Sequence, residues 1–134
     1  MTVTVTAFYA GIIGMLLLAL SFLVVKNRAR ARVSLGSGGD PGLERAIRAQ
    51  ANLAEYAPVT LILMLILEMA GASSWLLHGC GGVLVVSRVL HAIGMTNPGS
   101  PLNGRRLGTA GTWLGLLVLS VAAVTMSMQL PRYL

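Results

Sequence analysis

Three residues near the start of the second apolar segment have types and spacing suited to ligand binding. Arg48, Asn52 and Glu55 follow one another at intervals of four and three residues. On a helix they share one face, with Tyr56 beside them. A charged side chain at the centre of a membrane helix costs about 2.5 to 3.5 kcal/mol, and less towards the interface. Because a lipid-facing Glu55 gains nothing in return, we expect this stripe to face other helices.

Cations on two later segments are expected to reach the same region. Arg88 and His91 lie three residues apart in the third apolar segment, and Arg106 opens the fourth. Arg48, Arg88 and Arg106 are the candidate partners of the Glu55 carboxylate. Guanidinium groups bind carboxylates through paired hydrogen bonds, and a free glutamate binds an ammonium group. The predicted site therefore suits a small zwitterionic or polyanionic ligand.

Four apolar segments must position these residues. The chain has 134 residues, of which 55% are hydrophobic and 10% charged, and its mean hydropathy is +0.78. A water-soluble fold would have too little polar surface to cover these side chains. The sequence predicts a single all-α domain over residues 1–134, an integral membrane four-helix bundle, whose spans lie at about 3–25, 45–70, 75–95 and 107–130.

Short connections order the spans as an up-down-up-down bundle. We expect Asp40 to cap the second helix and Pro41 to be its first residue. The first turns of this helix should then lie among the lipid headgroups. Residues 71–74, "GASS", force a hairpin between the second and third helices. Residues 96–106, rich in turn formers, connect the third helix to the fourth. Small residues four apart favour close helix packing within the bundle: Ala7 and Gly11, Gly104 and Gly108, and Gly111 and Gly115.

The distribution of Lys and Arg predicts the orientation in the membrane. The connection between the second and third spans has none, whereas Arg105 and Arg106 precede the fourth span. The largest group surrounds the connection between the first two spans and consists of Lys26, Arg28, Arg30, Arg32, Arg45 and Arg48. The positive-inside rule therefore places both termini outside and the candidate site at the cytoplasmic face.

Several other kinds of site or partner are excluded or left without support. The net charge of +6 is explained by membrane orientation, so we expect no nucleic-acid partner. The single cysteine, Cys80, excludes an internal disulfide, and no metal site is predicted. Trp75 and Trp113 are interpreted as interface aromatics and Glu68 as an interfacial residue, while His78 has no evident partner.

The segment from Arg32 to Pro58, "RVSLGSGGDPGLERAIRAQANLAEYAP", resembles a known signature. It is similar to the first loop and second helix of the membrane-associated proteins in eicosanoid and glutathione metabolism, the MAPEG superfamily. That superfamily includes microsomal glutathione transferases, leukotriene synthase and an inducible prostaglandin E synthase. The pattern ERAxRAQxNxxEYxP joins the Arg, Asn and Glu spacing to Gln, Tyr and Pro at family positions. Four spans, length and orientation agree over the whole chain, and the last two helices match less closely.

The resemblance implies a homotrimer of four-helix bundles that holds glutathione between neighbouring subunits at the cytoplasmic end. It makes Arg106 the residue that activates the thiol, with Arg105 as the alternative, and it allows Arg28 or Arg30 to contact a ligand carboxylate. Met95 departs from the family, which often has a tyrosine there. The implied glutathione-binding residues are Arg48, Gln50, Asn52, Glu55, Tyr56, Arg88 and His91.

The hypothesis is a membrane-bound glutathione-dependent transferase, with peroxidase activity as a variant. The thiolate attacks a lipophilic electrophile or a lipid hydroperoxide that enters from the bilayer. Lowering the thiol pKa from about 8.5 to about 6.5 requires roughly 2.7 kcal/mol, which one guanidinium can supply at low dielectric. Small size and tight loops favour a bacterial inner membrane.

Two alternatives stay open at this point. One is a small four-helix transporter that couples an intramembrane glutamate to proton exchange. Glu55 argues against it, because it lies at a shallow depth among arginines. The other is a protein of the same fold that binds a different ligand or serves only as a membrane scaffold, and Met95 keeps this alternative open.

Overall fold

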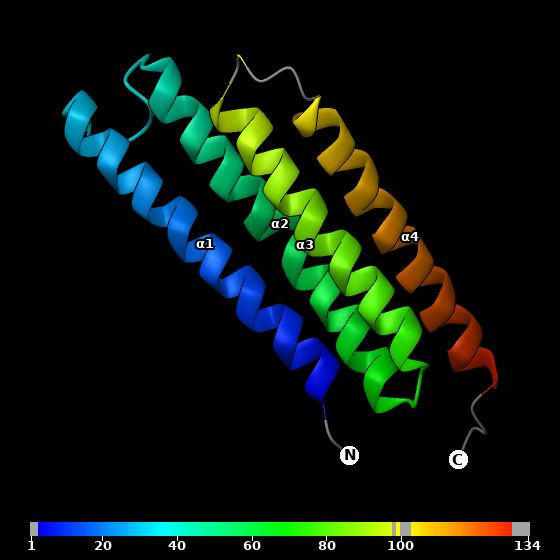
Figure 1. The fold of residues 1–134 in the computed structure, drawn as a ribbon. Helices are drawn as coiled ribbons and strands as arrows, with labels where there is room; N and C mark the ends of the chain where they lie inside the picture. The colour runs from blue at the N-terminus through cyan, green and yellow to red at the C-terminus, as the bar shows by residue number, and fades with distance from the viewer. Residues whose placement is uncertain (1–2, 98, 100–102, 130–134) are drawn as a thin grey trace.

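A computed structural model describes residues 3–97, 99 and 103–129 of the chain. These residues form an all-α bundle of four helices, α1 (Thr4–Ala31), α2 (Pro41–Met69), α3 (Ser74–Thr96) and α4 (Gly104–Gln129). Successive helices run in opposite directions, so the start of α1 and the end of α4 lie at the same end of the bundle (Figure 1). All four are long and apolar enough to cross a membrane. The predicted four-helix membrane bundle is therefore confirmed.

The helices extend beyond the predicted spans at their basic ends. α1 continues past residue 25 to Ala31, and the residue that caps it, Arg32, has a left-handed φ of 54°. α2 begins with Pro41, and the Asp40 side chain caps it by accepting a hydrogen bond from the Leu43 N–H at 2.7 Å, as predicted. α4 begins at Gly104, three residues before the predicted span. The predicted end of that span, residue 130, lies outside the described residues.

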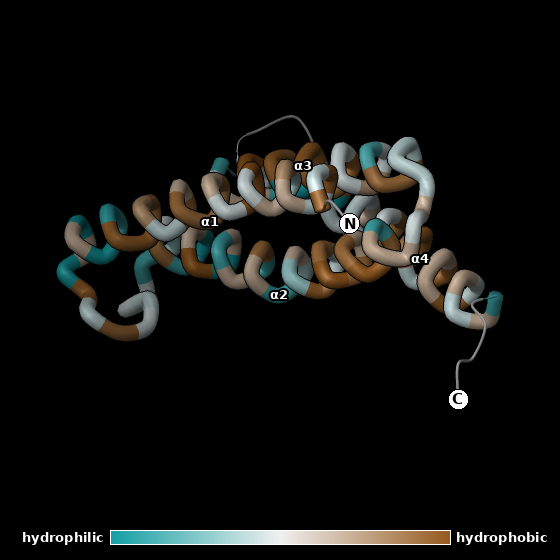
Figure 2. The backbone as a smooth tube through the Cα atoms, turned by 90° about the horizontal axis from the view of Figure 1, so that it is seen from below, coloured by the Kyte–Doolittle hydropathy of each residue, from teal (hydrophilic) through white to brown (hydrophobic). Residues whose placement is uncertain are grey.

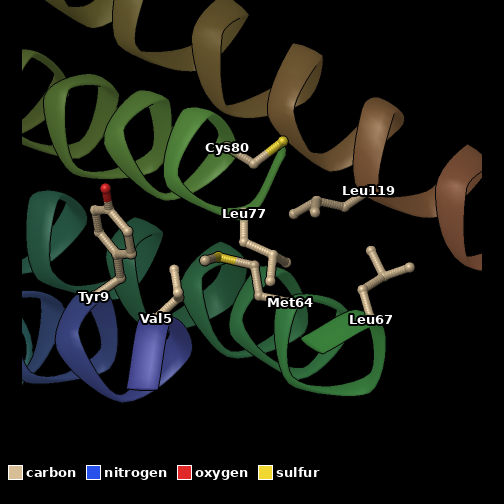
Figure 3. Packing of buried hydrophobic residues seen from close by; sticks show 7 residues of the cluster. All are labelled: Val5, Tyr9, Met64, Leu67, Leu77, Cys80 and Leu119. Atoms are coloured by element: carbon tan, nitrogen blue, oxygen red, sulfur yellow. The ribbon is translucent and has the colours of Figure 1, made fainter. Parts of the chain in front are cut away.

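Buried apolar side chains from all four helices hold the bundle together. Figure 2 shows apolar residues along most of the tube and hydrophilic ones gathered at the corner where α1 meets α2. One core cluster joins the helices near the α2–α3 hairpin (Figure 3). It consists of Val5, Tyr9, Met64, Leu67, Leu77, Cys80 and Leu119. Cys80 is a free, buried residue, so it packs as a small apolar side chain.

Glycines bring α4 close to α3. A Cβ atom on Gly108 would overlap the backbone oxygen of Ser87, and one on Gly104 would overlap that of Leu90. This contact confirms the predicted close packing for the first glycine pair of α4. The same prediction is wrong for the pair Ala7 and Gly11, because both are exposed and a Cβ on Gly11 would meet no atom within 4 Å.

Polar contacts join the start of α1 to α2 and α3, at the end of the bundle opposite the α1–α2 connection. The Glu68 carboxylate on α2 accepts hydrogen bonds from the backbone N–H groups of Val5 and Thr6, at 2.8 and 2.7 Å. The Tyr9 hydroxyl donates to the backbone oxygen of His78 at 3.0 Å. Glu68 thus supplies the cap that the sequence before α1 lacks.

Candidate functional site

Arg88 is the centre of a polar cluster that joins α2, α3 and α4. The residue is only 2% exposed. Its Nη1 donates to the side-chain oxygen of Asn52 at 2.6 Å, and its Nη2 donates to the backbone oxygen of Gly108 at 3.1 Å. The guanidinium carbon lies 5.5 Å from the centre of the Tyr56 ring, within the range of a cation–π contact. The close approach at Gly108 allows one side chain to bind all three helices.

Tyr56 links this cluster to the outer face of α4. The indole Nε1 of Trp113 donates to the Tyr56 hydroxyl at 3.3 Å. Trp113 is nevertheless 58% exposed, so most of its ring surface is free. The contacts between Arg88 and Tyr56 and between Tyr56 and Trp113 therefore connect the bundle interior to the surface.

A hollow of about 420 Å³ opens beside Trp113 on the outer face of α4. Arg105 and Arg106 are both exposed at its start, one turn before Thr109 and Ala110 and two turns before Trp113. All of its lining residues belong to α4, so it is an open depression along the surface of one helix. Two guanidinium groups and an aromatic ring give it a cationic end and an apolar end.

The structure brings together only part of the predicted site. Asn52, Tyr56 and Arg88 are in contact. His91 is buried on α3 against Gly108, one turn beyond Arg88. Gln50 lies on another face of α2, where its Nε2 donates to the Ser21 hydroxyl of α1 at 2.8 Å.

Arg48 and Glu55 are exposed on the surface of the chain. Within the described residues the Arg30–Asp40 contact is the sole ion pair. The expectation that the stripe faces other helices of the same chain, with Glu55 paired to an arginine, is therefore wrong for these two residues. The reason is the small, apolar stripe one position further round α2, which is buried in their place and includes Ala46, Ala49, Leu53, Ala57 and Thr60.

The arginines near the end of α1 are engaged by the α1–α2 connection. Arg28 donates to the backbone oxygen of Gly36 at 2.9 Å, and Arg30 pairs with Asp40 at 2.7 Å. The hydrogen bond from the Leu43 N–H, together with Arg30, holds the pKa of the Asp40 carboxyl below its usual range. These two arginines thus shape the loop in a single chain.

Met95 is apolar, and the described part of the chain gathers no metal-binding cluster. Met95 packs against the apolar cluster that contains Leu84 and Ala92. It therefore adds no polar group where the family often has a tyrosine. Among residues 3–97, 99 and 103–129, no three His, Cys, Asp or Glu side chains gather in a way that could hold a metal ion.

Sequence interpretation missed the polar contacts of Trp113 and Glu68, and also the contact of Tyr9 with His78. Trp113 lies seven residues after Arg106, which is two helical turns and so the same face of α4. That spacing could have linked it to the arginines. Nothing in the sequence around Glu68 indicates that it caps a helix more than sixty residues away.

Comparison with known proteins agrees with this architecture. The sequence model of the MAPEG family matches residues 6–125, which contain every residue of the polar cluster and the hollow. Two curated relatives are each named inner membrane protein YecN, from Escherichia coli strain K12 and from Escherichia coli O6:H1 strain CFT073. Each is 41% identical over 118 residues, which cover 88% of this chain and 88% of the relative. No solved structure matches the chain. The chain belongs to the MAPEG family.

Proposed function

We propose that the protein is a membrane-bound glutathione-dependent transferase. The observation that carries the proposal is the convergence of Asn52, Tyr56 and Arg88 from two helices, beside a hollow that two exposed arginines line on a third. Membership of a family that includes glutathione transferases supports it. The site has cations for the carboxylates of glutathione and a carboxylate, Glu55, for its ammonium group.

Arg88 acts in this proposal by positioning its neighbours. Because the side-chain oxygen of Asn52 accepts from Arg88, the amide nitrogen of Asn52 is left to donate to a peptide carbonyl of the ligand. The Tyr56 ring is oriented by Arg88 on one side and by Trp113 on the other. Arg88 itself is 2% exposed, so it holds the binding groups in place from behind.

Arg106 is the proposed activator of the thiol, with Arg105 as the alternative. Both line the hollow, and a guanidinium near sulfur favours the thiolate over the thiol. The thiol proton is released to water, and the sulfur then forms a bond to an electrophilic carbon of a lipophilic substrate. Either the leaving group on that carbon departs with its electron pair, or the π electrons of a conjugated bond move away and are protonated by water. In the peroxidase variant the sulfur attacks the terminal oxygen of a lipid hydroperoxide instead, and the O–O bond breaks to release the lipid alcohol. A second glutathione then converts the glutathione sulfenic acid to glutathione disulfide and water.

The exposed face of α2 supports a homotrimer. Arg48 and Glu55 continue along α2 into exposed apolar residues, Val59 at 51%, Ile62 at 55% and Ile66 at 51%. Charged groups at the edge of the bilayer are costly against lipid, so we propose that neighbouring subunits cover this face. Gln50, which lies towards α1, then contributes to a site completed by another subunit.

The proposed location is a bacterial inner membrane, with both termini outside and the site facing the cytoplasm. Two curated relatives are named as inner membrane proteins, and the positive-inside rule supports the orientation. The glutathione of the cytoplasm then reaches the polar cluster directly, while the lipophilic substrate arrives through the bilayer.

The proposal is tested by glutathione-dependent conjugation of a lipophilic electrophile in purified protein. Arg106→Ala should lower kcat/KM at least tenfold and raise the pH at which the rate increases, because the thiolate loses its counter-charge. Arg105→Ala is the matched control and should keep most of the activity. If only Arg105→Ala is impaired, the thiol activator is Arg105. If neither substitution changes the rate, guanidinium activation of the thiol is wrong.

A further inference from the structure

The hollow on α4 has arginines at one end and an aromatic ring at the other. Arg105 and Arg106 line its start and Trp113 lines it further along. Seven residues separate Arg106 from Trp113, which corresponds to about 10 Å along a helix that rises 1.5 Å per residue. An occupant that reaches both ends therefore has a polar or reactive group about 10 Å from an apolar end.

Trp113 is held in place although it lies at the surface. Its N–H donates to the Tyr56 hydroxyl, and the Tyr56 ring lies against the Arg88 guanidinium. Trp75, by contrast, is 88% exposed at the start of α3. With its polar atom already satisfied and its orientation fixed, Trp113 offers a ring to a ligand at little cost in conformational entropy.

The bilayer decides which ligands gain from this ring. A saturated chain that moves from lipid to Trp113 exchanges one apolar surrounding for another, so burial of its area provides little drive. A flat, electron-poor ring gains an oriented contact with the electron-rich indole that lipid tails do not provide. Stacking of this kind corresponds to about a two- to tenfold gain in binding.

We propose that Trp113 is the specificity-determining residue of the second-substrate subsite, which selects flat, conjugated electrophiles over saturated chains. The catalytic part of this inference rests on the proposed glutathione transferase activity. An aryl enone is a suitable substrate. The thiolate sulfur bonds to its β-carbon, the π electrons move to the carbonyl oxygen beside the guanidinium groups, and a proton from water completes the thioether.

Binding at Trp113 can be measured without glutathione, because the chain has only two tryptophans. Trp75→Phe leaves Trp113 as the sole indole, and Trp113→Phe leaves Trp75. Each variant is placed in lipid nanodiscs and titrated with 4-nitrobiphenyl, a flat, electron-poor quencher of about the required length that has no leaving group. Trp113 emission should fall to a plateau, whereas Trp75 emission should fall linearly with probe concentration. Linear quenching of equal slope in both variants would overturn the subsite.

Kinetics then test selectivity. In Trp113→Leu the KM for an aryl enone, measured at saturating glutathione, should rise about two- to tenfold more than the KM for a saturated-chain hydroperoxide does. Trp113→Phe keeps an aromatic face, so its KM for the aryl enone should lie between the values for the wild type and Trp113→Leu. An equal rise in KM for both substrates would contradict the inference. Saturable quenching in a protein that does not bind glutathione would overturn the proposed function and leave the aromatic subsite standing.

Discussion

At Arg88 a single side chain provides the polar connection among three helices. Its guanidinium is shared between the Asn52 side chain, the Gly108 backbone and the face of Tyr56. A buried cation of this kind is costly when a partner is removed, because the charge stays in a region that water does not reach. Asn52 accepts a hydrogen bond from Arg88, and in the proposed function its amide nitrogen also donates to glutathione.

Substitutions of Asn52 should separate these two contacts. Asn52→Ala leaves Nη1 of Arg88 without its side-chain acceptor, so the free energy of unfolding should fall by about 2 to 3 kcal/mol. Asn52→Asp keeps an acceptor and should preserve stability, yet lose glutathione affinity because it has no N–H to donate. Thermal unfolding and calorimetric titration measure the two effects.

Asn27→Ala is the control for these variants, since Asn27 donates to the Leu23 backbone and accepts from Arg30, both within its own helix. It should change stability by less than Asn52→Ala does. Equal losses for the two alanine variants would show that the contact with Arg88 contributes nothing special.

At the scale of helices, the sequence predicted where each helix lies in the chain, but it did not predict which face of α2 is buried. The Asp40 cap, the α2–α3 hairpin and the glycine contacts of α4 depend on local signals, and the structure has all three. Which stripe of α2 is buried depends on how well each face fits its neighbours, and the small residues beginning at Ala49 prevail over the stripe of Glu55. A difference of one position on the helix, about 100°, decides this choice.

The α3–α4 contact predicts a steric effect. Gly108→Ala places a methyl group against the Ser87 backbone and also displaces the oxygen that Arg88 uses. Because overpacking of this kind typically costs about 1 to 3 kcal/mol, unfolding in detergent should occur at a lower temperature. Gly79→Ala is the control, because a Cβ there meets nothing within 4 Å. Equal melting temperatures for the two variants would contradict the prediction, because they would mean that α3 and α4 accommodate the added methyl group without loss of stability.

The α1–α2 connection predicts a dependence of stability on acid. The folded-state pKa of Asp40 is lowered by the Leu43 N–H and Arg30, so the unfolded chain binds a proton more readily than the folded one does. The contribution of Asp40 is therefore present above its unfolded pKa of about 3.9 and is lost as the pH falls through the folded value. Unfolding curves from pH 6 to pH 3 should show this loss, and Asp40→Asn should reduce it. Glu44→Gln serves as the control, and a larger effect in that variant would contradict the assignment.

The whole molecule is a membrane bundle whose polar site is only partly closed within one chain. The two Nη atoms of Arg88 donate to groups inside the bundle, and its buried Nε has no hydrogen-bond partner among the described residues. Arg48 and Glu55 lie on the outer surface, with exposed apolar residues further along α2. The exposure of this surface could not be predicted from spacing alone. Helical periodicity shows that residues share a face, but not whether a helix of the same chain, another subunit or lipid covers that face. In the proposed trimer, neighbouring subunits cover both the charged and the apolar part of this face.

Cross-linking tests this assembly. In a Cys80→Ala background, Ile62→Cys on the exposed face of α2 should form disulfide-linked dimers under oxidation in membranes. Leu117→Cys on α4 is exposed to a similar degree, at 61% against 55%, and should form few. Equal cross-linking at both positions, or none at Ile62→Cys, would contradict an interface along α2.

Calorimetric titration of the purified protein with glutathione tests the central claim most directly. The wild type should bind glutathione, and Glu55→Ala should bind it at least tenfold more weakly, because the ligand ammonium loses its carboxylate partner. Glu44→Ala removes an exposed carboxylate at the start of the same helix and should bind as the wild type does. Absence of binding by the wild type at millimolar glutathione would contradict the proposed function.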